Sequence, residues 1–129
     1  MATFKMQPSK LEETLLKIEE FLQEADETSK YKIMFICEEL LTNLVRHADY
    51  EGRIPDITFS IEAKDNNAFE LQCKDNAKAF DILEHKDPDL DVAIDDREPG
   101  GLGIYLLKKY TKKMEYLYEK GYNILRMSL

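Results

Sequence analysis

Apolar residues recur at helical spacing in two stretches of the first third of the chain, after a short predicted strand at residues 3–7. The first stretch follows Ser9 and Glu12, which have the spacing of a capping box, and it ends at a polar break over residues 26–29. We therefore expect one helix up to this break and a second helix over about residues 30–48. The apolar positions are Leu11, Leu15, Ile18, Leu22 and Ala25 in the first helix and Ile33, Cys37, Leu40, Leu41, Leu44, Val45 and Ala48 in the second.

Strict alternation of apolar and polar residues predicts strands with one buried face. Alternation over residues 57–63 and again over 69–73, with an Asp-Asn-Asn turn between them, predicts a β-hairpin. Residues 114–119 and 122–129 predict a second hairpin that turns at Lys120-Gly121. Both hairpins follow helices in the chain, so strands and helices are segregated along the sequence.

The first part of the stretch between the two hairpins shows neither the spacing of a helix nor the alternation of a strand. Residues 84–98 contain seven acidic and two basic side chains and are expected to form a surface loop, and an apolar helix then runs from about Gly100 to Tyr110. The order of elements predicts an α+β fold in which helices cover one face of a mixed, mostly antiparallel sheet. The predicted core residues are Leu40, Leu44, Ile57, Phe59, Ile61, Leu71, Cys73, Ile104 and Leu107.

Length and charge narrow the classes of function. A chain of 129 residues is about one ordinary domain, and its 18 basic and 26 acidic residues give a net charge of 18 − 26 = −8. This charge argues against direct binding of nucleic acid or of an anionic membrane. No transmembrane or signal segment is evident, and Cys37 and Cys73 are expected to be buried thiols, so we expect a cytoplasmic protein.

The second predicted helix carries a set of three polar residues, Glu39, Asn43 and His47. Each step of four residues advances about 40° around a helix, so the three side chains span roughly 80° of one face. They lie beside the apolar stripe of the same helix. This arrangement fits the wall of a cleft, and it also fits an ordinary solvated helix face.

Two further motifs follow at the ends of predicted elements. Asp75-Asn76-Ala77 comes directly after a strand, where a carboxylate can accept a hydrogen bond from a ligand, although the same residues also favour a plain turn. Gly100-Gly101-Leu102-Gly103 opens a helix, where free amides and close backbone approach favour phosphate, although a flexible linker has a similar composition. No strand directly precedes these glycines, which argues against a dinucleotide-binding fingerprint.

Taken in order, the three motifs resemble the GHKL (histidine-kinase-like) ATPase family, with the strongest likeness to the small anti-sigma-factor serine/threonine-protein kinases. The stretches that carry the resemblance are EELLTNLVRHADY, DNAKAFD, PGGLGIYLLKKYTKKMEY and the final GYNILRMSL. The resemblance covers nearly the whole chain. It implies the two-layer Bergerat fold, a single ATP-binding domain over residues 1–129 and a lid loop at about residues 84–99.

The resemblance also implies a role for each matching residue. Glu39 matches the glutamate taken as general base, and Asn43 matches the asparagine that binds the Mg²⁺ bridging the ATP phosphates. Asp75 matches the aspartate that accepts from the adenine amino group. The implied cofactor-binding set is Asn43, His47, Asp75, Ala77, Phe80, Arg97, Gly101, Leu102 and Gly103, in which Arg97 would reach the γ-phosphate.

This sequence departs from the family pattern in two ways. Ala77 stands where the family usually has glycine, so we expect a methyl group near the adenine and weaker nucleotide binding. The acidic lid is unfavourable beside a triphosphate unless its carboxylates face solvent or a partner.

The function implied is an ATP-binding, Mg²⁺-dependent regulatory kinase. It would sequester a sigma-like factor and phosphorylate a serine or threonine of a small antagonist protein. The alternative is a sequestration module that binds a nucleotide, or none, without phosphotransfer. A histidine kinase fragment is disfavoured because no phosphoacceptor helical domain precedes the ATPase region. The tyrosines at positions 110, 116, 118 and 122 are expected to form a sheet-face or dimer surface, which leaves a homodimer open.

Overall fold

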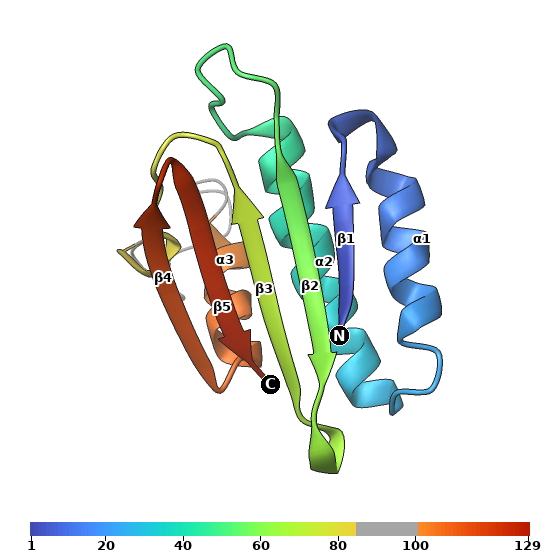
Figure 1. Cartoon of the computed structure of the whole chain (residues 1–129). Helices are drawn as coiled ribbons and strands as arrows, with labels where there is room; N and C mark the ends of the chain where they lie inside the picture. The colour runs from blue at the N-terminus through green and yellow to red at the C-terminus, as the bar shows by residue number, and fades with distance from the viewer. Residues whose placement is uncertain (85–100) are drawn as a thin grey trace.

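The computed structural model describes residues 1–84 and 101–129, without the side chain of Leu102. These residues form a five-stranded sheet in the order β1-β2-β3-β5-β4 (Figure 1). The elements in chain order are β1 (Ala2–Met6), η1 (Pro8–Lys10), α1 (Leu11–Phe21), α2 (Glu27–Arg46), β2 (Ile57–Ala63), η2 (Asp65–Asn67), β3 (Phe69–Asp75), η3 (Ile82–Glu84), α3 (Gly101–Tyr110), β4 (Lys113–Glu119) and β5 (Tyr122–Ser128).

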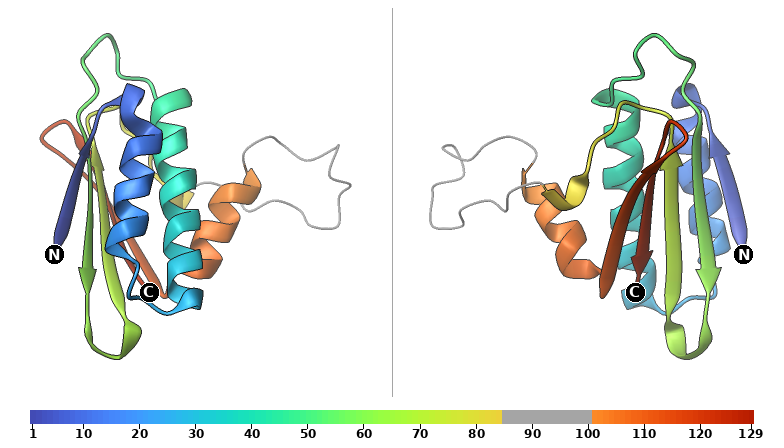
Figure 2. Two further views of the ribbon diagram at one scale, coloured as in Figure 1. Left: turned by 90° about the vertical axis from the view of Figure 1, so that its right-hand side faces the viewer. Right: turned by 60° about the vertical axis from the view of Figure 1, so that its left-hand side comes forward.

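The molecule has two layers, with α1, α2 and α3 on one face of the sheet (Figure 2). In β2 the side chains of Ile57, Phe59 and Ile61 are buried, while the polar residues between them alternate to the other face. The predicted α+β architecture is confirmed. Each strand pairing in the described chain is antiparallel, so the sheet is uniform where we expected a mixed one.

The hydrophobic core fills the space between the sheet and the helices. Eight of the nine predicted core residues are buried, and Leu44 is only half-buried, packed against the core near the end of α2. The core also contains residues of the first helix and of the last strand, such as Ile18 and Met127. The predicted apolar periods therefore identified the buried faces of the helices and the strands.

The ends of the helices differ from the sequence prediction. Pro8 begins a short 3₁₀ turn that includes Ser9, so α1 starts at Leu11 and no side chain caps it, which means that the predicted capping box does not form. The second helix starts earlier than predicted because Asp26 caps it, accepting a hydrogen bond from Ser29 N at 3.1 Å. None of the helices in the described ranges is both long and apolar enough to cross a membrane.

The four tyrosines predicted to form one surface are separated by the fold. Tyr110 of α3 packs edge-on against Phe35, with ring centroids 5.2 Å apart. Strand alternation puts Tyr116 on the helix face of the sheet and Tyr122 on the opposite face, where its hydroxyl bonds to Asp56. Within the described ranges the four tyrosines therefore do not share one face of the sheet, and the homodimer stays a prediction.

Both cysteines are buried free thiols, as predicted. Burial raises the pKa of the Cys37 thiol and that of the Cys73 thiol. Both groups are therefore protonated at neutral pH and are poor nucleophiles.

Candidate functional site

Helix α2 positions the first predicted group. Glu39 and Asn43 lie one turn apart in this helix and are both half-buried, so they occupy neighbouring positions on one face. His47 is the C-cap of the helix, with φ −122°, and is exposed. It directly follows the last residue of the helix and its N–H bonds to Asn43 O at 2.9 Å, so its predicted place beside the phosphates stays a prediction.

The first turn of α3 lies against Glu39. A methyl group built on Gly103 would overlap Glu39 Oε2 and stand 3.1 Å from Glu39 Cδ. Glycine lets α3 approach the Glu39 carboxylate this closely, and a larger residue would require the carboxylate to move. The structure thus brings together the predicted general base and a predicted phosphate-end glycine that are 64 positions apart in the sequence.

Gly103→Ala is expected to lower the free energy of unfolding in the wild-type background and to be neutral or stabilising in Glu39→Ala. The new methyl group displaces the Glu39 carboxylate, whereas alanine is otherwise favoured over glycine in a helix by about 1 kcal/mol. Denaturant unfolding of the two single variants and the double variant measures the coupling, which we expect at about 1–2 kcal/mol. Additive effects would show that this contact is absent in solution.

The segment after β3 forms the second group. Asp75 ends the strand and is 6% exposed, and its Oδ1 accepts a hydrogen bond from Ala77 N at 3.0 Å. Burial raises the pKa of the Asp75 carboxyl above its ordinary value, although the hydrogen bonds from Asn123 and Ala77 oppose this rise. A carboxylate in this environment is a strong acceptor for a donor that enters the site.

Ala77 does not strain the backbone of this segment. The residues with positive φ in the described chain lie elsewhere, so alanine adopts the conformation required at position 77 as readily as glycine would. Its side chain is also buried, at 3% exposure. The alanine is therefore compatible with the local fold, and its expected effect on nucleotide affinity stays a prediction.

Asn123 of β5 is a site residue that sequence reasoning missed. It is 7% exposed, and its Nδ2 donates to Asp75 Oδ1 at 2.9 Å. Its Oδ1 accepts from Phe80 N at 3.0 Å and from the Tyr116 hydroxyl. The signal for it was present in the sequence, because a polar residue at position 123 falls on the inward face of a strand whose next inward residues are Leu125 and Met127.

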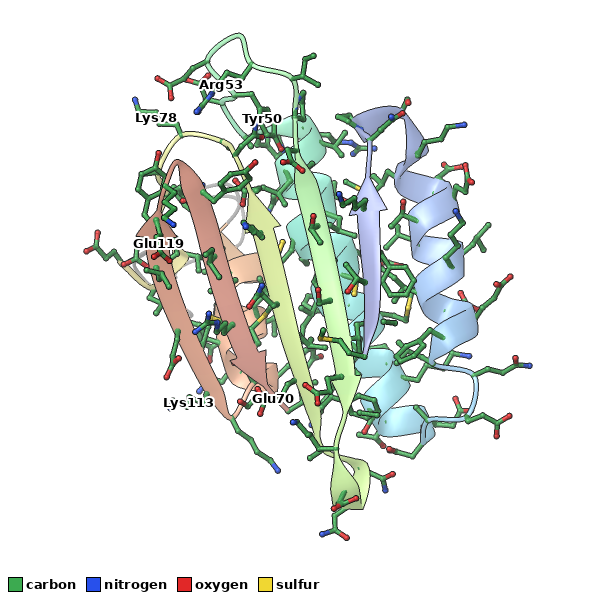
Figure 3. All side chains as sticks on the ribbon, viewed as in Figure 1. Tyr50, Arg53, Glu70, Lys78, Lys113 and Glu119 are labelled. Carbon is green, nitrogen blue, oxygen red and sulfur yellow. The ribbon has the colours of Figure 1, made fainter. Side chains whose placement is uncertain are left out.

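The segment after β3 is also joined to the connection between α2 and β2. Asn76 Oδ1 accepts from Asp56 N at 2.8 Å, and Asn76 Nδ2 donates to Ile54 O at 2.9 Å. Lys78 N donates to Asp49 O at 2.7 Å. Figure 3 shows Tyr50, Arg53 and Lys78 at the same end of the molecule. The end of α2 and the end of β3 therefore form one edge of the fold.

Tyr50 links the two groups at this edge. Its hydroxyl donates to Leu44 O, next to Asn43, at 2.7 Å. Burial raises the pKa of the Tyr50 phenol, and the nearby Asp75 carboxylate raises it further. Tyr50 therefore lies close to both the last turn of α2 and Asp75.

The predicted cleft itself is not delimited by the described residues. Phe80 is 59% exposed beside Asp75, whereas Arg97 and the predicted lid fall within residues 85–100, outside the described chain. A hollow of about 330 Å³ lies between β1, α1 and residues 55–57, and another of about 240 Å³ lies on the open face of the sheet. Neither hollow contains a predicted site residue.

The residues present fit a Mg²⁺-nucleotide in their chemistry. Asn43 offers a side-chain oxygen, which suits Mg²⁺ in combination with phosphate oxygens and water. Gly103 lets the first turn of α3 lie against the Glu39 carboxylate, and Asp75 offers an acceptor. No group of three or more metal-ligating side chains occurs in the described ranges, so phosphate oxygens would have to supply most of the ligands.

The comparisons with known proteins identify the family and the fold. A family model described as the histidine kinase-like ATPase domain matches residues 4–129. The serine/threonine-protein kinase BtrW of Bordetella bronchiseptica is 26% identical over 99 residues, which are 77% of this chain and 69% of that protein.

Two solved structures share the fold. The blue-light activated histidine kinase of Erythrobacter litoralis matches with a TM-score of 0.57 at 12% identity, over 81% of this chain and 31% of that one. A structure of the RsbU and RsbW domains of a Mycobacterium tuberculosis protein matches with a TM-score of 0.50 at 12% identity, over 99% and 32%. This chain therefore spans less than a third of either solved chain.

Proposed function

The chain belongs to the histidine kinase-like ATPase family, and we propose that it is an ATP-binding regulatory kinase. In this proposal it binds Mg-ATP, sequesters a sigma-like factor and phosphorylates a serine or threonine of a small antagonist protein. The observation that carries the proposal is the contact between Glu39 and Gly103. It places a carboxylate next to the helix N-terminus that the family motif assigns to phosphate.

Glu39 acts as the general base of the proposed transfer. Its carboxylate takes the proton from the serine hydroxyl as the serine oxygen forms a bond to the γ-phosphorus. The bond from the γ-phosphorus to the bridging oxygen breaks, and ADP leaves with that electron pair. When bound, ATP would supply the phosphoryl group and Mg²⁺ would neutralise charge on its phosphates. Asn43, one turn along α2, would hold Mg²⁺ through its side-chain oxygen, on the same helix face as Glu39.

Asp75→Asn is expected to weaken ATP binding by about tenfold and to leave the free energy of unfolding within about 1 kcal/mol of the wild-type value. The amide oxygen of asparagine still accepts from Ala77 and Asn123, but its nitrogen cannot accept from the adenine amino group. Fluorescent-ATP titration and denaturant unfolding measure the two effects. Unchanged ATP affinity would remove Asp75 from the site.

The same variant gives a pH test with a defined sign. Because burial raises the pKa of Asp75, its charged form destabilises the folded state. The free energy of unfolding of the wild type should therefore rise as the pH falls through this pKa. Protonation removes an acceptor, so wild-type ATP affinity should fall over the same range. Asp75→Asn should show neither change.

A phosphotransfer assay tests the function directly. Chain, Mg²⁺ and γ-labelled ATP are incubated with the antagonist-like proteins encoded beside its gene, and labelled serine or threonine is the expected product. ATP binding without any transfer would favour the alternative, sequestration without kinase activity. Two features favour this alternative: Ala77, which stands where the family usually has glycine, and the seven acidic residues of the 84–98 stretch, which oppose a triphosphate.

A further inference from the structure

A single buried amide organises the segment that follows β3. Asn123 Nδ2 donates to Asp75 Oδ1 at 2.9 Å, to Ala77 O at 3.1 Å and to Lys78 O at 3.2 Å. Three acceptors therefore share the two hydrogens of this nitrogen. The strand residue thus holds both the carboxylate and the peptide groups of the segment, across more than 40 positions of sequence.

The orientation of this amide is fixed from its other side. Asn123 Oδ1 accepts from Phe80 N at 3.0 Å and from the Tyr116 hydroxyl of β4. A flipped amide would turn its NH₂ group toward the Phe80 N–H and its oxygen toward the Asp75 carboxylate. The Phe80 N–H therefore ensures that Asn123 presents donors to Asp75, and the Tyr116 hydroxyl adds a second bond to the amide oxygen.

This arrangement determines which oxygen of Asp75 is open to a ligand. Both hydrogen bonds that Asp75 accepts in the described chain end on Oδ1, one from Ala77 N and one from Asn123 Nδ2. Within the described ranges, Oδ2 accepts no hydrogen bond. The carboxylate is held by one oxygen and offers the other as an acceptor.

We propose that Asn123 is a positioning residue which, with Tyr116 behind it, makes the site select adenine over guanine. Adenine carries an exocyclic amino donor where guanine carries a carbonyl oxygen, and a fixed carboxylate oxygen attracts the first and repels the second. A carboxylate free to rotate, or a segment free to shift, would discriminate less between the two bases. The inference rests on the proposed function, because it requires a nucleotide at Asp75.

Two variants and a matched control test this inference. Tyr116→Phe removes one of the two hydrogen bonds to the amide oxygen, and Asn123→Ala removes the amide. Tyr118→Phe removes a hydroxyl from the same strand at a position that is 45% exposed and contributes no bond to the network. Affinities for fluorescent ATP and GTP analogues are measured for each protein, together with thermal unfolding to establish that each is folded.

The ratio of ATP to GTP affinity is the decisive quantity. We expect it to fall by about tenfold in Asn123→Ala and by a few-fold in Tyr116→Phe, and to be unchanged in Tyr118→Phe. If Asn123→Ala does not fold, Tyr116→Phe alone decides the outcome. A structural role alone would weaken both nucleotides equally, and an unchanged ratio would overturn the inference.

The wild-type measurement separates this inference from the proposed function. A wild-type protein that binds neither nucleotide would overturn the proposed function itself. A wild-type protein that binds ATP and GTP equally would leave ATP binding intact and overturn only the role of Asn123 in selectivity.

Discussion

Glu39→Gln is expected to reduce phosphorylation of the antagonist protein by about 10²- to 10⁴-fold while leaving Mg-ATP affinity within a few-fold of the wild-type value. Glutamine keeps the size of the side chain but cannot accept the serine proton. It need not disturb binding, because Asn43 and Asp75, not Glu39, are the proposed contacts to metal and adenine. Single-turnover transfer of labelled phosphate measures the rate, and titration of a fluorescent ATP analogue measures the affinity.

The matched control for this variant is Glu38→Gln. Glu38 is the preceding residue of α2 and is exposed, so the substitution changes the charge equally but on another face of the helix. It should transfer phosphate at the wild-type rate. Equal transfer rates for the wild type and Glu39→Gln would remove Glu39 from the mechanism.

Asn43→Ala is expected to abolish the Mg²⁺-dependent part of ATP binding, a loss of about 10- to 100-fold in affinity at saturating Mg²⁺. Asn43 offers the only side-chain oxygen assigned to the metal, so its removal leaves the ion held by phosphates and water. Phosphotransfer should be lost together with binding, which distinguishes this variant from Glu39→Gln. Titrations with Mg²⁺ and with a chelator in its place measure the difference.

Asn43→Asp supplies the control, because it keeps an oxygen ligand at the same position. It should retain Mg²⁺-dependent binding, and both variants should unfold near the wild-type midpoint because position 43 is only half-buried. If Asn43→Ala binds Mg-ATP as tightly as the wild type, the metal is held elsewhere.

The sequence predicted the sheet well because hairpins are local structures. Alternation set the buried face of each strand, and the turn at Lys120-Gly121 has φ values of 52° and 84°, as a tight hairpin turn requires. Helix ends were less predictable. Several residues can compete to begin a helix, and here Pro8 and Asp26 determined the start where Ser9 and the polar break had suggested another.

The candidate site also has some features that a local sequence pattern predicts and others that it does not. The one-turn spacing of Glu39 and Asn43 follows from helix geometry, so the sequence was enough to pair them. The approach of Gly103 to Glu39 and the bonds of Asn123 to Asp75 depend on helix packing and strand register between distant segments. A local sequence pattern does not determine this packing or this register. The family motifs supplied the candidate site residues, and the fold showed that Asn123 bonds to one of them, Asp75.

The central claim is that this chain binds Mg-ATP at a site built from Asn43, Asp75 and Gly103. Titration of the wild-type protein with a fluorescent ATP analogue, with Mg²⁺ and then with a chelator in its place, tests it most directly. We expect saturable binding that weakens without Mg²⁺ and is competed by unlabelled ATP. Absence of binding at millimolar nucleotide would contradict it and leave a sequestration module that acts without nucleotide.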